Sequence, residues 1–387
     1  MSGVPDIDRL LSSRVRGMEA SGIRRIWQLG QECDDPINLS IGQPDFLVPK
    51  ELQEAAIEAI RDGCHGYTLT TGDESLRQII TTHLHATVGW PKPGEETSDV
   101  LVTSGTAGGL TLAALALLDP GDELIIPDPY FVIYPNLAKI AGAVAVLCDT
   151  YPDFRMTAER IEPLLTDRTK AVFLNSPANP TGVVLTDEEV ADIVALCHDR
   201  GVLLITDEIY DRFVFPPAAD PCPTAASHTS DMLLVRGFGK THGCTGWRLG
   251  YAAGPRSLIQ EMAKIQQHTF VCAPSMAQRA MHGAFDVDLD PLVRQFTHRR
   301  DMVVAALCDV TDLVMPEGAF YAFPKVPEHL GISATAFVEA AIERNVLVIP
   351  GDVFSPRDTH FRLSFAAPEP RLAEGLSILR SLITSGV

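Results

Sequence analysis

The sequence predicts an α/β protein, with a large domain built on a mainly parallel sheet covered by helices and a smaller α+β domain after it. From about residue 100, short apolar runs alternate with stretches of helical periodicity, as in strand–helix–strand units. These runs are rich in β-branched residues and lack polar alternation, which is typical of strands buried on both faces. At 387 residues, the chain is long enough for two domains packed around a cleft.

Six apolar runs are expected to supply the strands of the large domain. In chain order they are VLVTSG, ELIIPD, VAVLCD, KAVFLNSP, VLLITDEIY and DMLLVRGFG. The segments between them have helical periodicity, and one of these helices has clear start and stop signals. Thr186 followed by Glu189 fits a capping box, and Gly201 fits the end of that helix.

The pattern changes after about residue 285, where DPLVRQFTHRRDMVVAAL predicts a long helix followed by a smaller set of helices and strands. We therefore expect residues 45–285 to form the large domain and residues 286–387 the small domain. Residues 1–44 are expected to join the small domain.

Composition excludes several classes of function. The net charge of −19 argues against a general nucleic-acid or acidic-membrane surface. The eight cysteines are scattered, which fits a reducing cytoplasm better than disulfides or zinc. His83 and His85 would point apart on a helix, so no metal site is expected. The first residues have no long apolar core, so neither a signal peptide nor a membrane anchor is expected.

Polar residues follow four of the expected strands at the point where each strand ends. In parallel sheets the carboxyl ends of the strands lie at one edge, where loops and helix N-termini converge to form ligand sites. The residues placed there are Ser104, Gly105, Thr106, Asn179, Asp207 and Lys240. The turn at 104–106 opens a helix and could hold a phosphate, although many such turns are merely structural.

The stretch RGFGKTHGCTGWRLGY places Lys240 among glycines, with Arg248 eight residues later. A nucleotide-binding Walker A loop needs a glycine six positions before its lysine, and Leu234 occupies that position. Asp207 ends an apolar strand, where it is either a helix cap, a salt-bridge partner or the partner of a protonated ring nitrogen. A phosphate cradle, a buried carboxylate and a lysine suited to imine chemistry together point to pyridoxal phosphate.

From about Leu10 to Leu382, the chain resembles the class I/II aminotransferases, which are pyridoxal-phosphate enzymes of fold type I. Nine motifs occur in the order and spacing of that family. They are LSIGQPDF, YTLTTGDESLR, SGTAGG, DPYFVIYP, NSPANPTG, TDEIYD, GKTHGCTGWRLGY, EGAFYAFP and FRLSFA. The resemblance implies an enzyme that transfers an amino group from an amino acid to a 2-oxo acid by a ping-pong mechanism.

The resemblance implies a role for each matching residue of the cofactor site. Lys240 corresponds to the Schiff-base lysine, which also shuttles the proton. Arg248 and the turn formed by Ser104, Gly105 and Thr106 correspond to the residues that hold the phosphate of pyridoxal 5'-phosphate.

Five further residues complete the implied cofactor site. Phe131 would stack on the face of the cofactor ring, and Asp207 would pair with the ring nitrogen. Asn179 and Tyr210 would hydrogen-bond the phenolic oxygen of the ring. The implied catalytic residues are Lys240, Asp207 and Tyr210. Tyr67 would reach the phosphate held by a neighbouring subunit, which implies a homodimer.

The resemblance also implies a substrate site and shows one departure from the family pattern. Arg362 would clamp the α-carboxylate with its planar fork, next to Gly42 and Asn179. Relatives usually carry serines at the positions of Gly237 and Gly239, of which the first contributes a hydroxyl to the phosphate.

Other functions stay open at this point. A carbon–sulfur β-lyase of the same fold, or an enzyme that cyclises S-adenosylmethionine, would share these cofactor residues. A pyridoxal-phosphate-sensing transcription regulator is disfavoured, because the family pattern begins near residue 10 and the charge is acidic. A noncatalytic binding protein would require Lys240, Asp207 and Arg362 to be coincidental.

The residues that select the substrate side chain are poorly marked. Some aspartate-using relatives have a lysine at the position of Thr106, and Arg16, Arg61 or Arg279 could replace it in binding a distal carboxylate. Alternatively, aromatic and aliphatic residues could line a pocket for an apolar side chain, or be ordinary core; these are Ile41, Tyr67, Tyr134 and Phe354.

Overall fold

The computed structural model describes residues 6–18, 22–30, 34–93, 97–218 and 221–386. Its centre is a seven-stranded sheet with the order β2-β8-β7-β6-β5-β3-β4. Strand β8 (Gly250–Pro255) runs antiparallel to both of its neighbours, and the other pairings are parallel. The α/β fold class predicted from the sequence is confirmed.

The six expected apolar runs all contribute strands to this sheet. Their bounds are β2 Ser98–Thr103, β3 Glu123–Asp128, β4 Val144–Asp149, β5 Thr169–Asn175, β6 Leu203–Asp207 and β7 Leu233–Gly237. Side chains alternate between the two faces of the sheet: in β3, Leu124 and Ile126 pack on one face and Ile125 on the other. Both faces are apolar because helices cover both of them.

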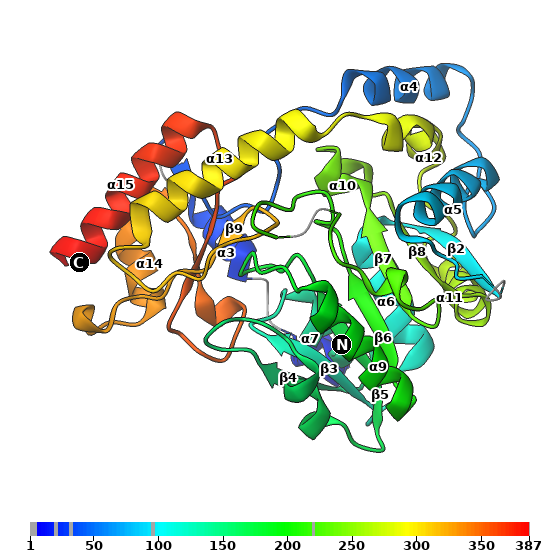
Figure 1. Ribbon diagram of the computed structural model, residues 1–387, viewed down its shortest axis with the longest axis horizontal. Coiled ribbons are helices and arrows are strands. Elements are labelled where there is room, and N and C mark those ends of the chain that lie inside the picture. Colours follow the sequence, from blue (N-terminus) through cyan, green and yellow to red (C-terminus); the bar gives the residue numbers. More distant parts are fainter. Residues whose placement is uncertain (1–5, 19–21, 31–33, 94–96, 219–220, 387) are drawn as a thin grey trace, which may run out of the picture.

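Two groups of helices enclose the sheet (Figure 1). On one face pack α6 (Gly105–Leu117), α7 (Ile133–Ala141) and α11 (Arg256–Thr269). The other face is covered by α5 (Glu74–Val88), α9 (Asp187–Arg200) and α12 (Ser275–Ala280). Helix α4 (Lys50–Arg61) lies at the edge of the molecule against α12, and the short α8 (Ala158–Ile161) packs against α9.

The remaining elements form a second, smaller layer beside the sheet (Figure 1). It contains α13 (Asp290–Leu307), α14 (Ala334–Glu343) and α15 (Glu369–Ser385). A three-stranded antiparallel sheet has the order β11-β12-β9. Its strands are β9 (Tyr321–Ala322), β11 (Ile349–Pro350) and β12 (Phe361–Ser364).

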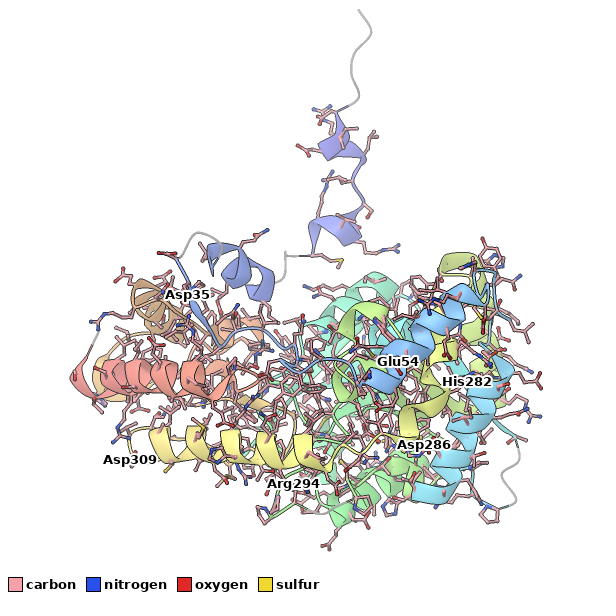
Figure 2. The ribbon with its side chains drawn as sticks, turned by 90° about the horizontal axis from the view of Figure 1, so that it is seen from above. Asp35, Glu54, His282, Asp286, Arg294 and Asp309 are labelled. Atoms are coloured by element: carbon pink, nitrogen blue, oxygen red, sulfur yellow. The ribbon has the colours of Figure 1, made fainter. Side chains whose placement is uncertain are left out.

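The N-terminal part of the chain packs with this C-terminal layer. Strand β1 (Ile37–Asn38) pairs in parallel with β10 (Val346–Leu347), more than 300 residues away in the sequence. Helix α3 (Gly22–Gly30) contacts β10 and β11. By contrast, α1 (Ile7–Leu10) and α2 (Ser13–Arg16) stand away from the body of the protein (Figure 2).

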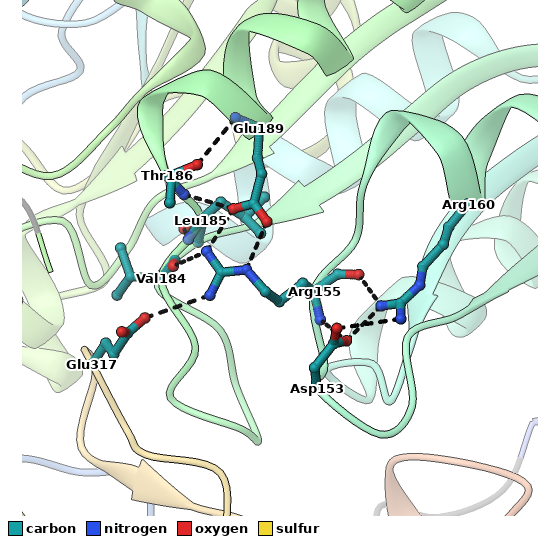
Figure 3. A network of polar contacts seen from close by, with 9 residues as sticks. Asp153, Arg155, Arg160, Val184, Leu185, Thr186, Glu189 and Glu317 are labelled. Carbon is teal, nitrogen blue, oxygen red and sulfur yellow. Dashed lines mark hydrogen bonds and ion pairs between the residues drawn. The ribbon is translucent and has the colours of Figure 1, made fainter.

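The expected capping box of α9 is present, and Arg155 connects it to the small layer (Figure 3). Thr186 accepts a hydrogen bond from the N–H of Glu189, whose carboxylate accepts one from the N–H of Thr186. Arg155 binds that same carboxylate at 2.5 and 2.6 Å. Its remaining nitrogen lies 3.6 Å from Glu317, just before β9. Arg155, in the loop between β4 and α8, therefore links the start of α9 to the segment that carries Tyr321.

Among the described residues, no helix is both long and apolar enough to cross a membrane. The same ranges contain no cluster of histidine, cysteine or acidic side chains suited to a metal ion. The seven described cysteines are free thiols, and Cys33 lies outside the described residues.

Candidate active site

The candidate site lies at one edge of the seven-stranded sheet. Strand β2 is antiparallel to β8, which is antiparallel to β7, so β2 and β7 run in the same direction and end at the same edge. Strands β5 and β6 are parallel to β7 and end there too. The loops that carry Ser104, Asn179, Asp207 and Lys240 therefore share this edge, as expected from the sequence.

Lys240 belongs to the short helix α10 (Phe238–Thr241), which begins directly after β7. Its ammonium donates a hydrogen bond to the carbonyl oxygen of Gly42 and lies 5.9 Å from the centre of the Phe320 ring. Burial, together with the nearby cations Arg362 and Arg248, lowers the pKa of Lys240 to about 8, although Asp207 acts in the opposite direction. A lysine with this pKa has an appreciable neutral fraction near neutral pH, as nucleophilic and basic lysines require.

Asp207 is buried at the end of β6, and Tyr134 of α7 supports its carboxylate. The Tyr134 hydroxyl donates a hydrogen bond of 2.9 Å, and the N–H of Ile209 donates one of 3.3 Å. Burial raises the pKa of Asp207 to about 6, although both hydrogen bonds act in the opposite direction. From the sequence, Tyr134 could line a substrate pocket or be ordinary core; it is buried in the core, against Asp207.

The guanidinium of Arg248 lies close to the N-terminus of α6. Gly105 has φ +70°, and a Cβ atom added to it would lie 2.8 Å from a terminal nitrogen of Arg248. Ser104 precedes a 13-residue helix, and its side chain makes no capping hydrogen bond to that helix. Arg248 itself is exposed and has φ +55°. The N-terminus of the helix and the guanidinium are therefore neighbours, and both favour an anion.

The two glycines that replace serines have different surroundings. A Cβ atom at Gly237 would lie 2.8 Å from Cδ1 of Ile209 and 3.0 Å from Cγ2 of Thr106. At Gly239, the nearest atom would be Cα of Thr245 at 3.4 Å, which is ordinary contact. Thr106 and Ile209 thus occupy the space that a serine at position 237 would need.

Arg362 of β12 forms the other half of the site and is 1% exposed. One terminal nitrogen donates to Oδ1 of Asn179 at 3.0 Å, and the other donates to the carbonyl oxygen of Ser40 at 2.7 Å. Within the described chain, its Nε has no hydrogen-bond partner. Rings of Tyr321 and Phe354 lie 4.5 and 4.8 Å from the guanidinium carbon. These contacts leave part of a buried cation available to an anionic group.

Tyr321 connects the surroundings of Arg362 to Tyr210, and it was not among the residues singled out from the sequence. Its hydroxyl lies 2.9 Å from the hydroxyl of Tyr210, and both side chains are buried. A Cβ atom at Gly42 would lie only 2.1 Å from the same hydroxyl, so position 42 must be glycine for the two segments to approach this closely. The aromatic motif EGAFYAFP was a signal for Tyr321.

Asn175, the last residue of β5, also belongs to this site, although it was not among the candidates predicted from the sequence. Its amide donates to the carbonyl oxygen of Asp207 at 2.8 Å, and its side-chain oxygen accepts from the N–H of Asn179 at 2.9 Å. It therefore holds the loop of Asn179 against the end of β6. Its position at the end of a buried strand was the available signal.

The structure does not bring every candidate into the interior. Tyr67 is 84% exposed. Phe131 is half-buried and packs edge-on against Tyr134, with 5.9 Å between ring centres. The arginines considered for a distal carboxylate are exposed on the surface of this chain; they are Arg16, Arg61 and Arg279. Ile41 is half-buried and Phe354 is fully buried.

A cavity of about 340 Å³ lies beside α3, and none of the candidate residues lines it. Its lining includes Tyr130 and Val132, which flank Phe131, and Val353, which precedes Phe354. Residues of α3, α7 and α14 complete the lining. This space lies between the sheet layer and the smaller layer.

Comparison with known proteins gives consistent results. Residues 34–377 match the sequence profile of the family described as Aminotransferase class I and II. A probable N-acetyl-LL-diaminopimelate aminotransferase of Bacillus subtilis is 34% identical, over 97% of this chain and 96% of that protein. The crystal structure of an aspartate aminotransferase from Thermotoga maritima has a TM-score of 0.88 and 33% identity, over 96% of this chain and 99% of that one. An aromatic aminotransferase from Pyrococcus horikoshii has a TM-score of 0.86 and 29% identity, over 93% and 99%.

Proposed function

The chain belongs to the class I and II aminotransferase family, whose members depend on pyridoxal phosphate, and we propose that it uses this cofactor to transfer an amino group from an amino acid to a 2-oxo acid. The observation that carries the proposal is that Lys240, Asp207 and Arg248, at one edge of the seven-stranded sheet, lie close to Arg362 of β12. In an acidic chain, three cations and one buried carboxylate at the same place indicate a site for anionic ligands.

The residues present fit the cofactor. The N-terminus of α6 and the adjacent guanidinium of Arg248 together suit a phosphate. We propose that Ser104, Gly105, Thr106 and Arg248 hold it. Asp207 is a buried carboxylate that suits a protonated ring nitrogen. We assign the remaining cofactor contacts to Phe131, Asn179, Tyr210 and Lys240.

When bound, pyridoxal phosphate supplies an aldehyde for covalent attachment and a ring that accepts electrons. We propose that Lys240 then holds or moves the proton of the substrate α-carbon, since its lowered pKa keeps part of the amine neutral. Asp207 balances positive charge at the ring, and Tyr134 keeps its carboxylate oriented. Arg362 binds the substrate carboxylate in a water-poor setting, where a charge-assisted contact is strong.

The active unit is proposed to be a homodimer in which Tyr67 reaches the phosphate of the neighbouring subunit. Its exposure of 84% supports this, because a phenol that is so exposed is available to a second chain. We also propose the division into a segment 1–44, a large domain 45–285 and a small domain 286–387. The pairing of β1 with β10 supports the inclusion of the N-terminal segment in the small domain.

A panel of amino donors tests the proposed reaction. Each donor is supplied with 2-oxoglutarate or with pyruvate, and the products are measured together with the absorbance change of the bound cofactor. For a ping-pong transaminase, an amino donor alone should change the absorbance of the bound cofactor, and the oxo acid should then restore the original absorbance. Steady release of pyruvate and ammonia without any oxo acid would instead identify a β-lyase.

A further inference from the structure

Residues 67–73, here called the strap, carry Tyr67 across the surface without forming a helix or a strand. Backbone N–H and C=O groups in such a segment need partners outside regular secondary structure. The N–H of Val102 in β2 donates to the carbonyl oxygen of Thr71 at 3.0 Å. Gly72 has φ +107°, and a Cβ atom there would lie 2.5 Å from Val102, so the strap approaches β2 very closely.

Two fully buried glutamines hold the inner side of the strap. The amide nitrogen of Gln278 in α12 donates to the Thr68 hydroxyl at 3.1 Å, and its oxygen accepts from the N–H of Asp73 at 2.7 Å. Gln278 thus clamps both ends of the strap. Gln266 in α11 donates to the carbonyl oxygens of Thr70 at 2.6 Å and Val102 at 3.0 Å.

Such glutamines are costly in an apolar core, because a buried amide without partners is destabilising. The side-chain oxygen of Gln266 has no hydrogen-bond partner among the described residues. The hydrogen bonds that offset the burial of this side chain are therefore those of its amide nitrogen, to Thr70 and Val102. Asp73 at the end of the strap is fixed further: it caps α5 through Leu76 and lies 2.9 Å from His282, which Figure 2 places beside α5.

The outer side of the strap has a different character. Tyr67 is 84% exposed and Leu69 is 65% exposed, although their neighbours Thr68 and Thr70 contact the buried glutamines. The strap is therefore rigid on its inner side and presents an aromatic side chain outward. Such an arrangement lowers the conformational cost of a contact made by Tyr67.

We propose that Gln278, supported by Gln266, is a positioning residue that orients the strap so that Tyr67 reaches the phosphate in the site of a second copy of this chain. This inference rests on the proposed function, in which Tyr67 acts across a homodimer. Gln278 touches neither substrate nor cofactor; it acts on the neighbouring site through the strap.

A double-mutant cycle on cofactor release tests the inference. Gln278→Met keeps the side-chain volume and removes both contacts to the strap, and Gln78→Met on the exposed face of α5 is the matched control. We expect Gln278→Met and Tyr67→Phe each to speed release of pyridoxal phosphate about tenfold, as for the loss of one hydrogen bond to a charged group. The double variant should be no faster than Tyr67→Phe alone, because both changes remove the same contact. Additive effects would contradict a role through Tyr67.

Hybrid dimers test whether the effect crosses the interface. A Gln278→Met subunit is paired with a Lys240→Ala subunit, and borohydride at timed intervals fixes the cofactor only at the site that retains Lys240. That site receives Tyr67 from a subunit with an intact Gln278, so its release rate should return to that of the parent. Continued fast release in the hybrid would show a local structural effect and overturn the proposal.

The controls separate this inference from the function on which it rests. If Tyr67→Phe leaves cofactor release unchanged, the role of Tyr67 across the dimer is wrong. If Tyr67→Phe accelerates release but Gln278→Met does not, only the positioning role is wrong. Should Gln278→Met fail to fold, Thr68→Val removes the hydroxyl that Gln278 binds, and a smaller acceleration that is again lost in the Tyr67→Phe background is expected.

Discussion

The proposed cofactor half and the proposed substrate half of the site are built in different ways. The cofactor half consists of loops that follow neighbouring strands of one sheet, so the sheet register alone brings Asp207 and Lys240 together. The substrate half is assembled from segments far apart in the sequence: Arg362 binds Ser40 and Asn179, across separations of 322 and 183 residues. Only packing between the two layers creates that half.

This difference indicates how the halves should respond to change. A substitution at a strand end affects a position that the whole sheet defines, so its consequences should stay local. A substitution in the substrate half should alter substrate binding and the docking of the small layer together. Lys240 spans the two halves, since it follows β7 and binds the carbonyl oxygen of Gly42.

The largest expected effect follows from removing the cation of the substrate half. Arg362→Leu should lower kcat/KM about 10³-fold, as for the loss of a buried charged partner. Arg362→Lys keeps the charge without the planar fork, so an intermediate loss is expected. Steady-state kinetics and cofactor titration of both variants measure this. Cofactor binding that weakens as much as substrate binding would show that the two halves are not separable.

Asp207→Asn should separate function from stability in the cofactor half. Turnover should fall about 10²–10³-fold, because a preorganised charge is lost. The folded pKa of Asp207, about 6, lies above its unfolded value of 3.8. Its contribution to stability is therefore fully present below about pH 4 and is lost as the pH rises through about 6.

The asparagine variant does not ionise, so without cofactor it should be more stable than the parent at pH 7, by up to about 3 kcal/mol. At pH 4 the two proteins should have similar stability. Denaturant unfolding of both proteins at the two pH values provides the measurement. A variant that is less stable than the parent at pH 7 would contradict the view that burial disfavours the ionised carboxylate of Asp207.

The smallest effects concern the two glycines before Lys240. Gly237→Ser should weaken cofactor binding about tenfold, because its Cβ atom would press on Ile209 and Thr106. Gly239→Ser meets only ordinary contact and should change binding less than about twofold. Thr106→Ser in the Gly237→Ser background removes one of the obstructing methyl groups and should recover part of the loss. Equal effects of the two serines, in equilibrium cofactor titrations, would sink this explanation.

The two halves also differed in how far the sequence predicted them. Strand periodicity and the rule for strand ends located Asp207 and Lys240, because the sheet is continuous and its strands are strongly apolar. Arg362 and Gly42 came only from resemblance to a family, since no local pattern reports a contact over some 300 residues. Tyr134 was left open between a pocket and ordinary core; it is buried in the core and binds Asp207, a contact over 73 residues that no local pattern reports.

The most direct test concerns the amine of Lys240. The protein is saturated with pyridoxal phosphate, reduced with borohydride, digested, and its peptides are weighed by mass spectrometry. A single modified peptide that contains Lys240 is the predicted result, and Lys240→Ala should lack both the tag and turnover. A tag on another lysine, or a protein that does not bind the cofactor, would contradict the account.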